Sequence, residues 1–145
     1  LMLWRMCGKP AATKAASFAD ASADWYQDAL SWAVENGYVN GLSDTRFGPD
    51  APITRQQATA ILFRLNGGQS GAELMLTSIY EQTFTDSASI ASWAKPALWW
   101  AVYQELVSGV GGSRIAPEAN ASRAQIAAIL LRYADKFMTE TEEAA

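Results

Sequence analysis

Histidine is missing from the 145-residue sequence, and cysteine occurs only once, as Cys7. Without histidine the chain lacks the commonest general base and metal ligand, and a histidine-based catalytic triad is excluded. A single cysteine rules out an internal disulfide and argues against a thiolate metal cluster. Asp44 and Asp50 could open a calcium loop, but Arg55 stands where its twelfth residue, a bidentate glutamate, is required. We therefore predict no catalytic residues, no metal and no cofactor.

Positive charge and long apolar runs are also scarce. The net charge is −4 and the isoelectric point about 4.7, which argues against a nucleic-acid-binding protein. No apolar stretch approaches the roughly 18 residues of a membrane-spanning helix, so we expect no membrane insertion. Half of the residues are hydrophobic (50%) and 18% are charged, a balance typical of a folded chain. The six tryptophans indicate either an aromatic core or flat binding platforms.

The sequence contains an internal repeat. A shift of 68 positions, which takes Arg55 to Arg123, lays residues 25–65 over residues 93–133 without a gap. Such self-similarity is the signature of repeat architecture. Each copy opens with Phe-x-Asp, at Phe18 and Phe84. Pairs of identical residues include Trp25/Trp93, Ala29/Ala97, Trp32/Trp100, Gly41/Gly109, Arg46/Arg114, Pro49/Pro117, Gln57/Gln125 and Leu62/Leu130.

Each copy predicts two helices joined by a loop. Apolar residues recur at helical spacing from Trp25, which predicts a first helix over 23–36, and by homology of the copies over 92–104. We expect Trp25 and Trp93 to lie in the core. Gly37 is suited to end the first of these helices. The loops 38–50 and 106–118 are rich in turn residues, with room for one or two residues of strand. Residues 73–82 could add a helical turn or two.

The second helix of each copy begins with a capping box, Thr54 to Gln57 and Ser122 to Gln125. An arginine follows each cap, although a helix N-terminus carries roughly +0.5 charge and disfavours a cation. One such arginine would mean little. Its recurrence at Arg55 and Arg123 indicates that each helix start is built to hold an anion.

The repeat divides the chain into six segments and predicts a mainly α fold. Residues 1–10 match the end of a second helix and are interpreted as the remnant of a preceding repeat. We expect a linker at 11–17, a repeat at 18–66, a linker at 67–83, a repeat at 84–137 and an acidic tail at 138–145.

These fixed-spacing features together resemble the S-layer homology (SLH) module. They are Phe-x-Asp, the Trp-Ala helix, the glycine loop, Phe-x-Pro, Ile-Thr-Arg and a helix ending in Leu-x-Arg. The resemblance implies helix-loop-helix repeats packed as a partial pseudo-threefold spindle with grooves between repeats. It implies a secreted, non-enzymatic module of the bacterial cell wall. Its partner would be an acidic, pyruvylated secondary polysaccharide attached to peptidoglycan.

The resemblance also implies which residues bind. Arg55 and Arg123 would contact the acidic sugar substituent; the alternative is a solvated arginine, or a structural one that ties a neighbouring repeat through a carboxylate. Further candidates are Thr54, the loop residue Asp44, the glycines Gly41 and Gly109, and the tryptophans Trp32 and Trp100. The tryptophans could equally serve packing, and the glycines could serve turns with positive φ. The sequence departs from the family where Gln57 and Gln125 replace a glutamate and where Gly112 replaces the aspartate matched by Asp44.

A second function stays open at this point. An incomplete set of repeats leaves apolar surface for another chain to cover, so the module could instead make protein–protein contacts in a surface layer or filament. Its partner would be a second copy or a third repeat from a missing upstream segment. A third alternative is that this chain is only the anchor of an enzyme.

Overall fold

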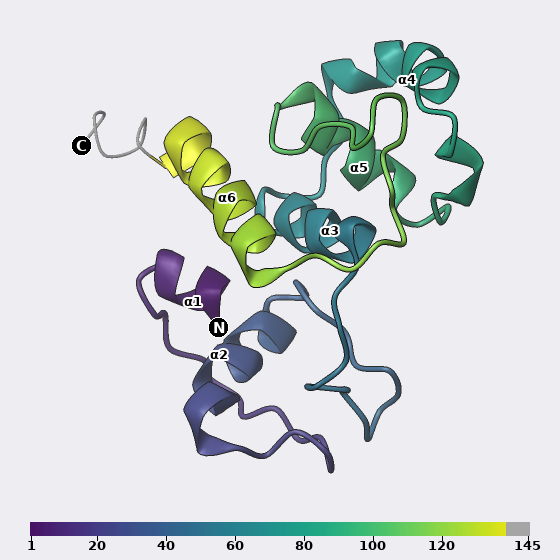
Figure 1. Cartoon of the computed structure of the whole chain (residues 1–145). Coiled ribbons are helices and arrows are strands. Elements are labelled where there is room, and N and C mark those ends of the chain that lie inside the picture. Colours follow the sequence, from purple (N-terminus) through teal and green to yellow (C-terminus); the bar gives the residue numbers. More distant parts are fainter. Residues whose placement is uncertain (139–145) are drawn as a thin grey trace. The chain divides into compact units, whose positions relative to one another are not determined.

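The computed structural model describes residues 1–138, so the expected acidic tail lies, apart from Met138, outside the described residues. The chain divides into two compact units, Leu1–Ala51 and a second one that begins at Pro52. The fold is mainly helical, as predicted (Figure 1). Within residues 1–138, no helix combines the length and the apolar character that a membrane crossing requires.

The first unit contains α1 (Met2–Met6) and α2 (Asp24–Glu35), which contact each other. The intervening segment, predicted as a linker, has no helix but is attached to α2. Ala16 N donates to Ser31 Oγ at 2.9 Å, and Gln27 Nε2 donates back to Ala16 O at 2.8 Å. Thr13 also donates to the Glu35 carboxylate, which holds the pKa of Glu35 below its ordinary value. Helix α2 ends at Glu35, and Gly37 follows its C-cap with φ of 74°, as predicted for a glycine that ends a helix.

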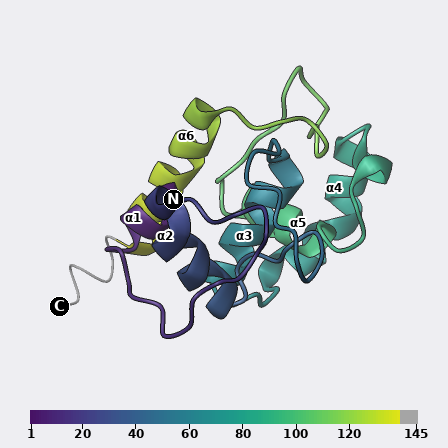
Figure 2. The ribbon, with the colours of Figure 1, turned by 90° about the horizontal axis from the view of Figure 1, so that it is seen from below.

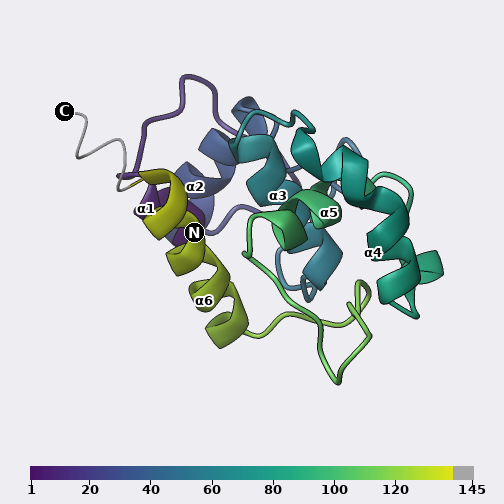
Figure 3. The same ribbon diagram turned by 90° about the horizontal axis from the view of Figure 1, so that it is seen from above.

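The second unit contains the remaining helices: α3 (Arg55–Leu65), α4 (Thr77–Thr83), α5 (Lys95–Tyr103) and α6 (Arg123–Tyr133). A 3-10 helix, η1 (Ala72–Leu76), precedes α4, so the predicted extra helical turns at 73–82 are confirmed. A shorter one, η2 (Ser87–Ser89), precedes α5, and a π-helical turn, η3 (Ala134–Met138), follows α6. Helix α5 lies between α3 and α4 in each view (Figures 2 and 3).

Two adjacent tryptophans of α5 form the centre of this core. Trp99 stacks toward α4, with its ring centroid 5.4 Å from that of Tyr80. Trp100 faces α3 and the end of α6, at 5.5 Å from Phe63 and 6.0 Å from Phe137. Successive residues on a helix point about 100° apart, which lets one helix serve both neighbours.

The unit boundary falls inside the first sequence repeat, between Ala51 and Pro52. The first helix of that repeat, α2, belongs to the first unit, whereas its second helix, α3, packs against α5 of the following repeat. The compact units and the sequence repeats are therefore different divisions of the chain.

The prediction that Trp25 and Trp93 are core residues is wrong. Trp25 is 71% exposed and Trp93 is 53% exposed. Trp25 is the second residue of α2, and Trp93 lies in the turn that precedes α5, so both stand at or before the start of their helix. Trp25 contacts the ring of Tyr26 edge-on, at a centroid distance of 4.9 Å.

Candidate functional site

Both predicted capping boxes are present. At α3, Thr54 Oγ1 accepts from Gln57 N at 3.3 Å and Gln57 Oε1 accepts from Thr54 N at 2.9 Å. At α6, Ser122 and Gln125 make the same reciprocal pair at 3.1 and 2.8 Å. The boxes fix the backbone of each helix start and thereby place the arginine that follows the cap.

The first turn of α3 is joined to the loop of the following repeat. Arg55 N donates to Ala119 O at 2.9 Å and Gln56 N donates to Pro117 O at 3.0 Å. Thr54 faces Asn120 in an isolated antiparallel bridge. Protein acceptors thus occupy the free N–H groups of this turn, and the start of α3 does not offer its backbone donors to an anion. What α3 presents at this end is the side chain of Arg55.

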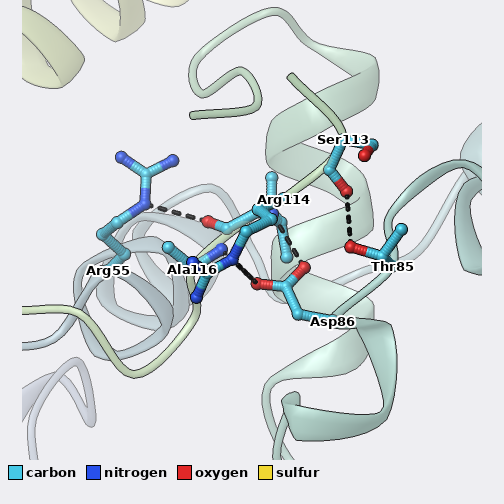
Figure 4. Close-up of polar contacts among 7 residues, drawn as sticks. Arg55, Thr85, Asp86, Ser113, Arg114 and Ala116 are labelled. Atoms are coloured by element: carbon cyan, nitrogen blue, oxygen red, sulfur yellow. Dashed lines mark hydrogen bonds and ion pairs between the residues drawn. The ribbon is translucent and has the colours of Figure 1, made fainter. Parts of the chain in front are cut away.

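The Arg55 guanidinium lies on the loop 106–118. Its Nε donates to Ile115 O at 3.1 Å and its Nη2 donates to Ser108 O at 2.9 Å. Figure 4 shows the first of these bonds, with the guanidinium fork extending past the loop backbone. Arg55 is only 7% exposed, although the described residues place no carboxylate in a salt bridge with it. This nearly buried positive charge is therefore hydrogen-bonded to carbonyl groups rather than to a carboxylate.

The same loop is held from its other side by Asp86 (Figure 4). Its carboxylate accepts from Ile115 N at 2.9 Å and from Ala116 N at 2.8 Å. Burial acts to raise the pKa of Asp86, but these two backbone donors and the charge of Arg114 outweigh it and hold the pKa below the ordinary value. Burial lowers the pKa of Arg55, and the negative charge of Asp86 opposes that change. Arginine nevertheless stays protonated in proteins.

The first repeat contains the same loop clasp. Asp20 accepts from Phe47 N at 2.8 Å and from Gly48 N at 2.9 Å, and these bonds lower the pKa of Asp20. An aspartate just ahead of a helix often caps it, but no side chain caps α2 or α5, and both carboxylates bind the loop backbone instead.

Gly41 and Gly109 are required for close packing beneath the loops. Neither adopts positive φ, so the turn explanation for these glycines is wrong. A Cβ atom on Gly41 would lie 2.5 Å from Cε1 of Phe18, and one on Gly109 would lie 2.9 Å from Gly112 O. Each glycine thus lets the loop lie directly on the phenylalanine of its own Phe-x-Asp segment, Phe18 or Phe84.

The other predicted site residues are dispersed. Trp32 and Trp100 are 6% and 3% exposed and pack on aromatic rings, Trp32 on Tyr38 at 5.2 Å, which favours their packing role. Asp44 is exposed on the loop of the first unit, with Gly41. Arg123 is exposed at the start of α6 and has no hydrogen-bond or salt-bridge partner among the described residues. The structure brings together Arg55, Thr54 and Gly109.

Sequence reasoning grouped each arginine with the loop of its own repeat, and the structure places Arg55 on the loop of the next one. The loop at Arg55 is therefore the one that carries Gly112, not the one that carries Asp44. The presence of Asp44 in the first repeat is therefore no argument for ligand binding at Arg55. The sequence signal for this pairing was the Gly-Gly pair in the loop 106–118, which leaves room beside the backbone for an arginine of another repeat. This signal is too weak by itself.

Two tandem helix-loop-helix copies, linked by an arginine of one and the loop of the next, define the chain as a repeat module. The model of the S-layer homology domain matches residues 17–59 and 83–127. The chain belongs to this family.

Curated relatives share about a third of their aligned residues with this chain. An amylopullulanase of Thermoanaerobacterium thermosulfurigenes is 33% identical over 141 residues, which cover 93% of this chain and 7% of the relative. A surface-layer 125 kDa protein of Lysinibacillus sphaericus is 33% identical over 123 residues, 80% of this chain and 10% of the relative. An endoglucanase of a Bacillus strain is 31% identical over 130 residues, 90% of this chain and 14% of the relative. The chain thus spans only a small part of each of these relatives.

Proposed function

We propose that this chain is a non-catalytic module that anchors a larger protein to the bacterial cell surface. The family occurs here in relatives as different as a surface-layer protein and polysaccharide-degrading enzymes. A segment common to proteins of such different names supplies location rather than chemistry. The third alternative, an enzyme of which this chain is the anchor, is included in this proposal.

We further propose that the ligand is an acidic, pyruvylated secondary polysaccharide of the cell wall, bound where Arg55 lies on the loop 106–118. The observation that carries this proposal is the charge of Arg55. Its Nε and Nη2 bind carbonyls, and in the part of the chain that the structure describes its Nη1 has no acceptor and no carboxylate lies within salt-bridge distance. An arginine fork suits a sugar carboxylate because it can bind both oxygens. Thr54 and Gly109 position the helix start and the loop around it.

The test compares binding to purified sacculi that retain or lack their secondary polysaccharide. The wild-type chain should sediment with the complete sacculi and stay in solution with the stripped ones. Arg55→Lys keeps the positive charge but loses the planar fork, so its binding should fall at least tenfold while the circular dichroism spectrum is unchanged. Arg5→Ala removes an exposed cation from α1 and should bind like the wild type. Equal binding by wild type and Arg55→Lys would overturn the assignment of Arg55, and equal binding to stripped sacculi would overturn the ligand.

The alternative, a structural module that makes protein–protein contacts, is favoured by a separate observation. The backbone N–H groups of Arg55 and Gln56 in α3 bind carbonyls, whereas within residues 1–138 those of Arg123 and Ala124 in α6 have no acceptor.

A further inference from the structure

Arg114 is an exposed arginine on the loop that also binds Arg55. Its side chain is 67% exposed, and its ion pair with Asp86 is long, at 3.9 Å from Nε to Oδ2. Within residues 1–138 no group accepts a hydrogen bond from its guanidinium. Its two outer nitrogens, Nη1 and Nη2, therefore have no partner in the described part of the chain. An exposed arginine means little by itself, but the backbone that carries this one is fixed.

The tip of the loop is held on both sides of Arg114. Val110 N donates to Arg114 O at 2.7 Å across an isolated antiparallel bridge, which closes the tip. Ser113 O, on the preceding residue, accepts from Thr85 N at 2.8 Å and from Thr85 Oγ1 at 3.3 Å (Figure 4). The side chain of Arg114 therefore starts from a backbone that is already in place before any ligand binds.

This backbone segment also brings Arg114 next to Arg55, and Figure 4 shows both. Arg55 Nε donates to the carbonyl of Ile115, the residue that follows Arg114, at 3.1 Å. Between the two cations lies Asp86, whose side chain is only 15% exposed and whose oxygens accept from backbone N–H groups. One negative charge thus stands against two positive ones, and the segment keeps a net positive charge.

The tip leaves the approach to Arg114 open. Gly111 and Gly112 have φ of 55° and 90°, and a Cβ atom on either would meet no atom within 4 Å. In the first repeat the corresponding residues are Ser43 and Asp44. A carboxylate two residues before the arginine would repel an anion, and Gly112 removes that charge. The departure from the family pattern at Gly112 therefore makes the second loop better suited to an acidic ligand.

We propose that Arg114 is a second ligand-binding cation, so that the site takes a polysaccharide segment with acidic groups on two neighbouring sugars. One group is bound by Arg55 and the other by Arg114. The two guanidinium groups lie at different depths, since Arg55 is 7% exposed and the Arg114 side chain 67%, which places separate acidic groups at them. The free fork of Arg114 suits a carboxylate because it can bind both oxygens. This inference rests on the proposed function and narrows the ligand class to a glycan with adjacent acidic substituents.

Titration calorimetry of the 145-residue chain with two matched synthetic disaccharides tests the proposal. One carries a pyruvate ketal on each sugar, and the other carries it on the terminal sugar only, so the pair differs by one carboxylate. The wild-type chain should bind the doubly acidic probe about five- to tenfold more tightly. Arg114→Gln should bring this ratio close to one and leave the affinity for the singly acidic probe within about twofold of the wild type. Arg5→Gln removes an exposed cation from α1 and should keep the wild-type ratio.

The outcomes separate this inference from the proposed function. Suppose that the wild type binds both probes and that Arg55→Lys weakens both. If Arg114→Gln then keeps the wild-type ratio, or if the wild-type ratio is itself near one, the inference is overturned and the proposed function stands. If the wild type binds neither probe, or if Arg55→Lys binds both as the wild type does, the proposed function fails and the inference fails with it.

Ionic strength gives a second readout that a merely structural role of Arg114 would not produce. Surface charges are screened over roughly 10 Å at 0.1 M salt and roughly 3 Å at 1 M, whereas buried charges are screened much less. The advantage of the doubly acidic probe should therefore shrink toward one as sodium chloride rises to about 1 M, while binding of the singly acidic probe at Arg55 should weaken less. The urea midpoint of Arg114→Gln should match the wild type, because its ion pair is long and exposed. An advantage that does not change with salt would contradict a contact at Arg114.

Discussion

The peptide groups of Ile115 connect Asp86 to Arg55. Its N–H donates to Asp86 Oδ1 at 2.9 Å and its carbonyl accepts from Arg55 Nε at 3.1 Å. A negative charge fixed by one repeat and a positive charge from the preceding one thus act on opposite sides of one backbone segment. Their direct attraction opposes the cost of burying Arg55. The loop between them is where stability and the proposed ligand site meet.

Arg55 and Arg123 should differ sharply in their effect on stability. Arg55→Ala leaves the carbonyls of Ile115 and Ser108 without their donors, so we expect the free energy of unfolding to fall by about 2–4 kcal/mol. Arg123→Ala removes the same side chain from an exposed helix start and should change it by less than about 0.5 kcal/mol. Urea unfolding of dilute protein measures both. Equal losses in the two variants would contradict the burial of Arg55.

Acid should weaken the two loop clasps. The pKa values of Asp20 and Asp86 are lowered in the fold, so their contribution is complete above the unfolded pKa of about 4 and is lost as the pH falls through the folded values. The melting temperature should therefore change little between about pH 7 and pH 5 and fall below about pH 4.

Asp86→Asn provides the matched variant for this pH dependence. It keeps one carbonyl acceptor for Ile115 N or Ala116 N but carries no titrating charge. Stability at neutral pH should fall by about 1–2 kcal/mol, and the drop in melting temperature below pH 4 should be smaller than in the wild type. An unchanged acid profile would assign that drop to other carboxylates.

The loop glycines should not tolerate a methyl group. A Cβ on Gly41 or Gly109 would lie 2.5 to 2.9 Å from the nearest atoms, so Gly41→Ala and Gly109→Ala should each cost about 1–3 kcal/mol. Thermal denaturation of the two variants should give melting temperatures below that of the wild type, and an unchanged melting temperature in either would contradict the close packing of its loop.

A buried and an exposed tryptophan should differ in their effect on stability. Trp100 is 3% exposed and Trp25 is 71% exposed. Trp100→Ala should cost about 3–5 kcal/mol, as large-to-small changes in cores do, whereas Trp25→Ala should cost less than about 1 kcal/mol. Acrylamide quenching provides an independent check, because Trp25→Phe should remove much more of the quenchable fluorescence than Trp100→Phe.

Local chemistry made part of this structure predictable from the sequence. The capping boxes at Thr54 and Ser122 depend on residues three positions apart, and Gly37 ends its helix through a single backbone angle. Each of these features is complete within one turn of chain. The sequence therefore predicted these features with the correct residues, and it predicted the helix bounds to within a few positions.

Contacts between repeats were not predictable in the same way. Helical spacing placed Trp25 on the apolar stripe, but spacing does not reveal whether another element covers the end of that stripe. The partners of Asp86, Ile115 and Ala116, lie 29 and 30 residues away, so no local pattern around Asp86 indicates them. The pairing of Arg55 with the following loop likewise spans 60 residues to Ile115. Such partners depend on how the copies pack, which the repeat alone does not specify.

The unit boundary at Ala51 and Pro52 means that duplication and folding are out of phase in this chain. The segment that is copied in the sequence runs from one Phe-x-Asp to the next, but the segment that packs together starts at α3. A swap of modules made at the linker 67–83 would separate α3 from α5 and Arg55 from Ile115, while one made after Ala51 would keep them together. Recombination among such proteins should therefore keep α3 together with the following repeat. The interchangeable part is then the second helix of one repeat with the loop of the next repeat that contacts it.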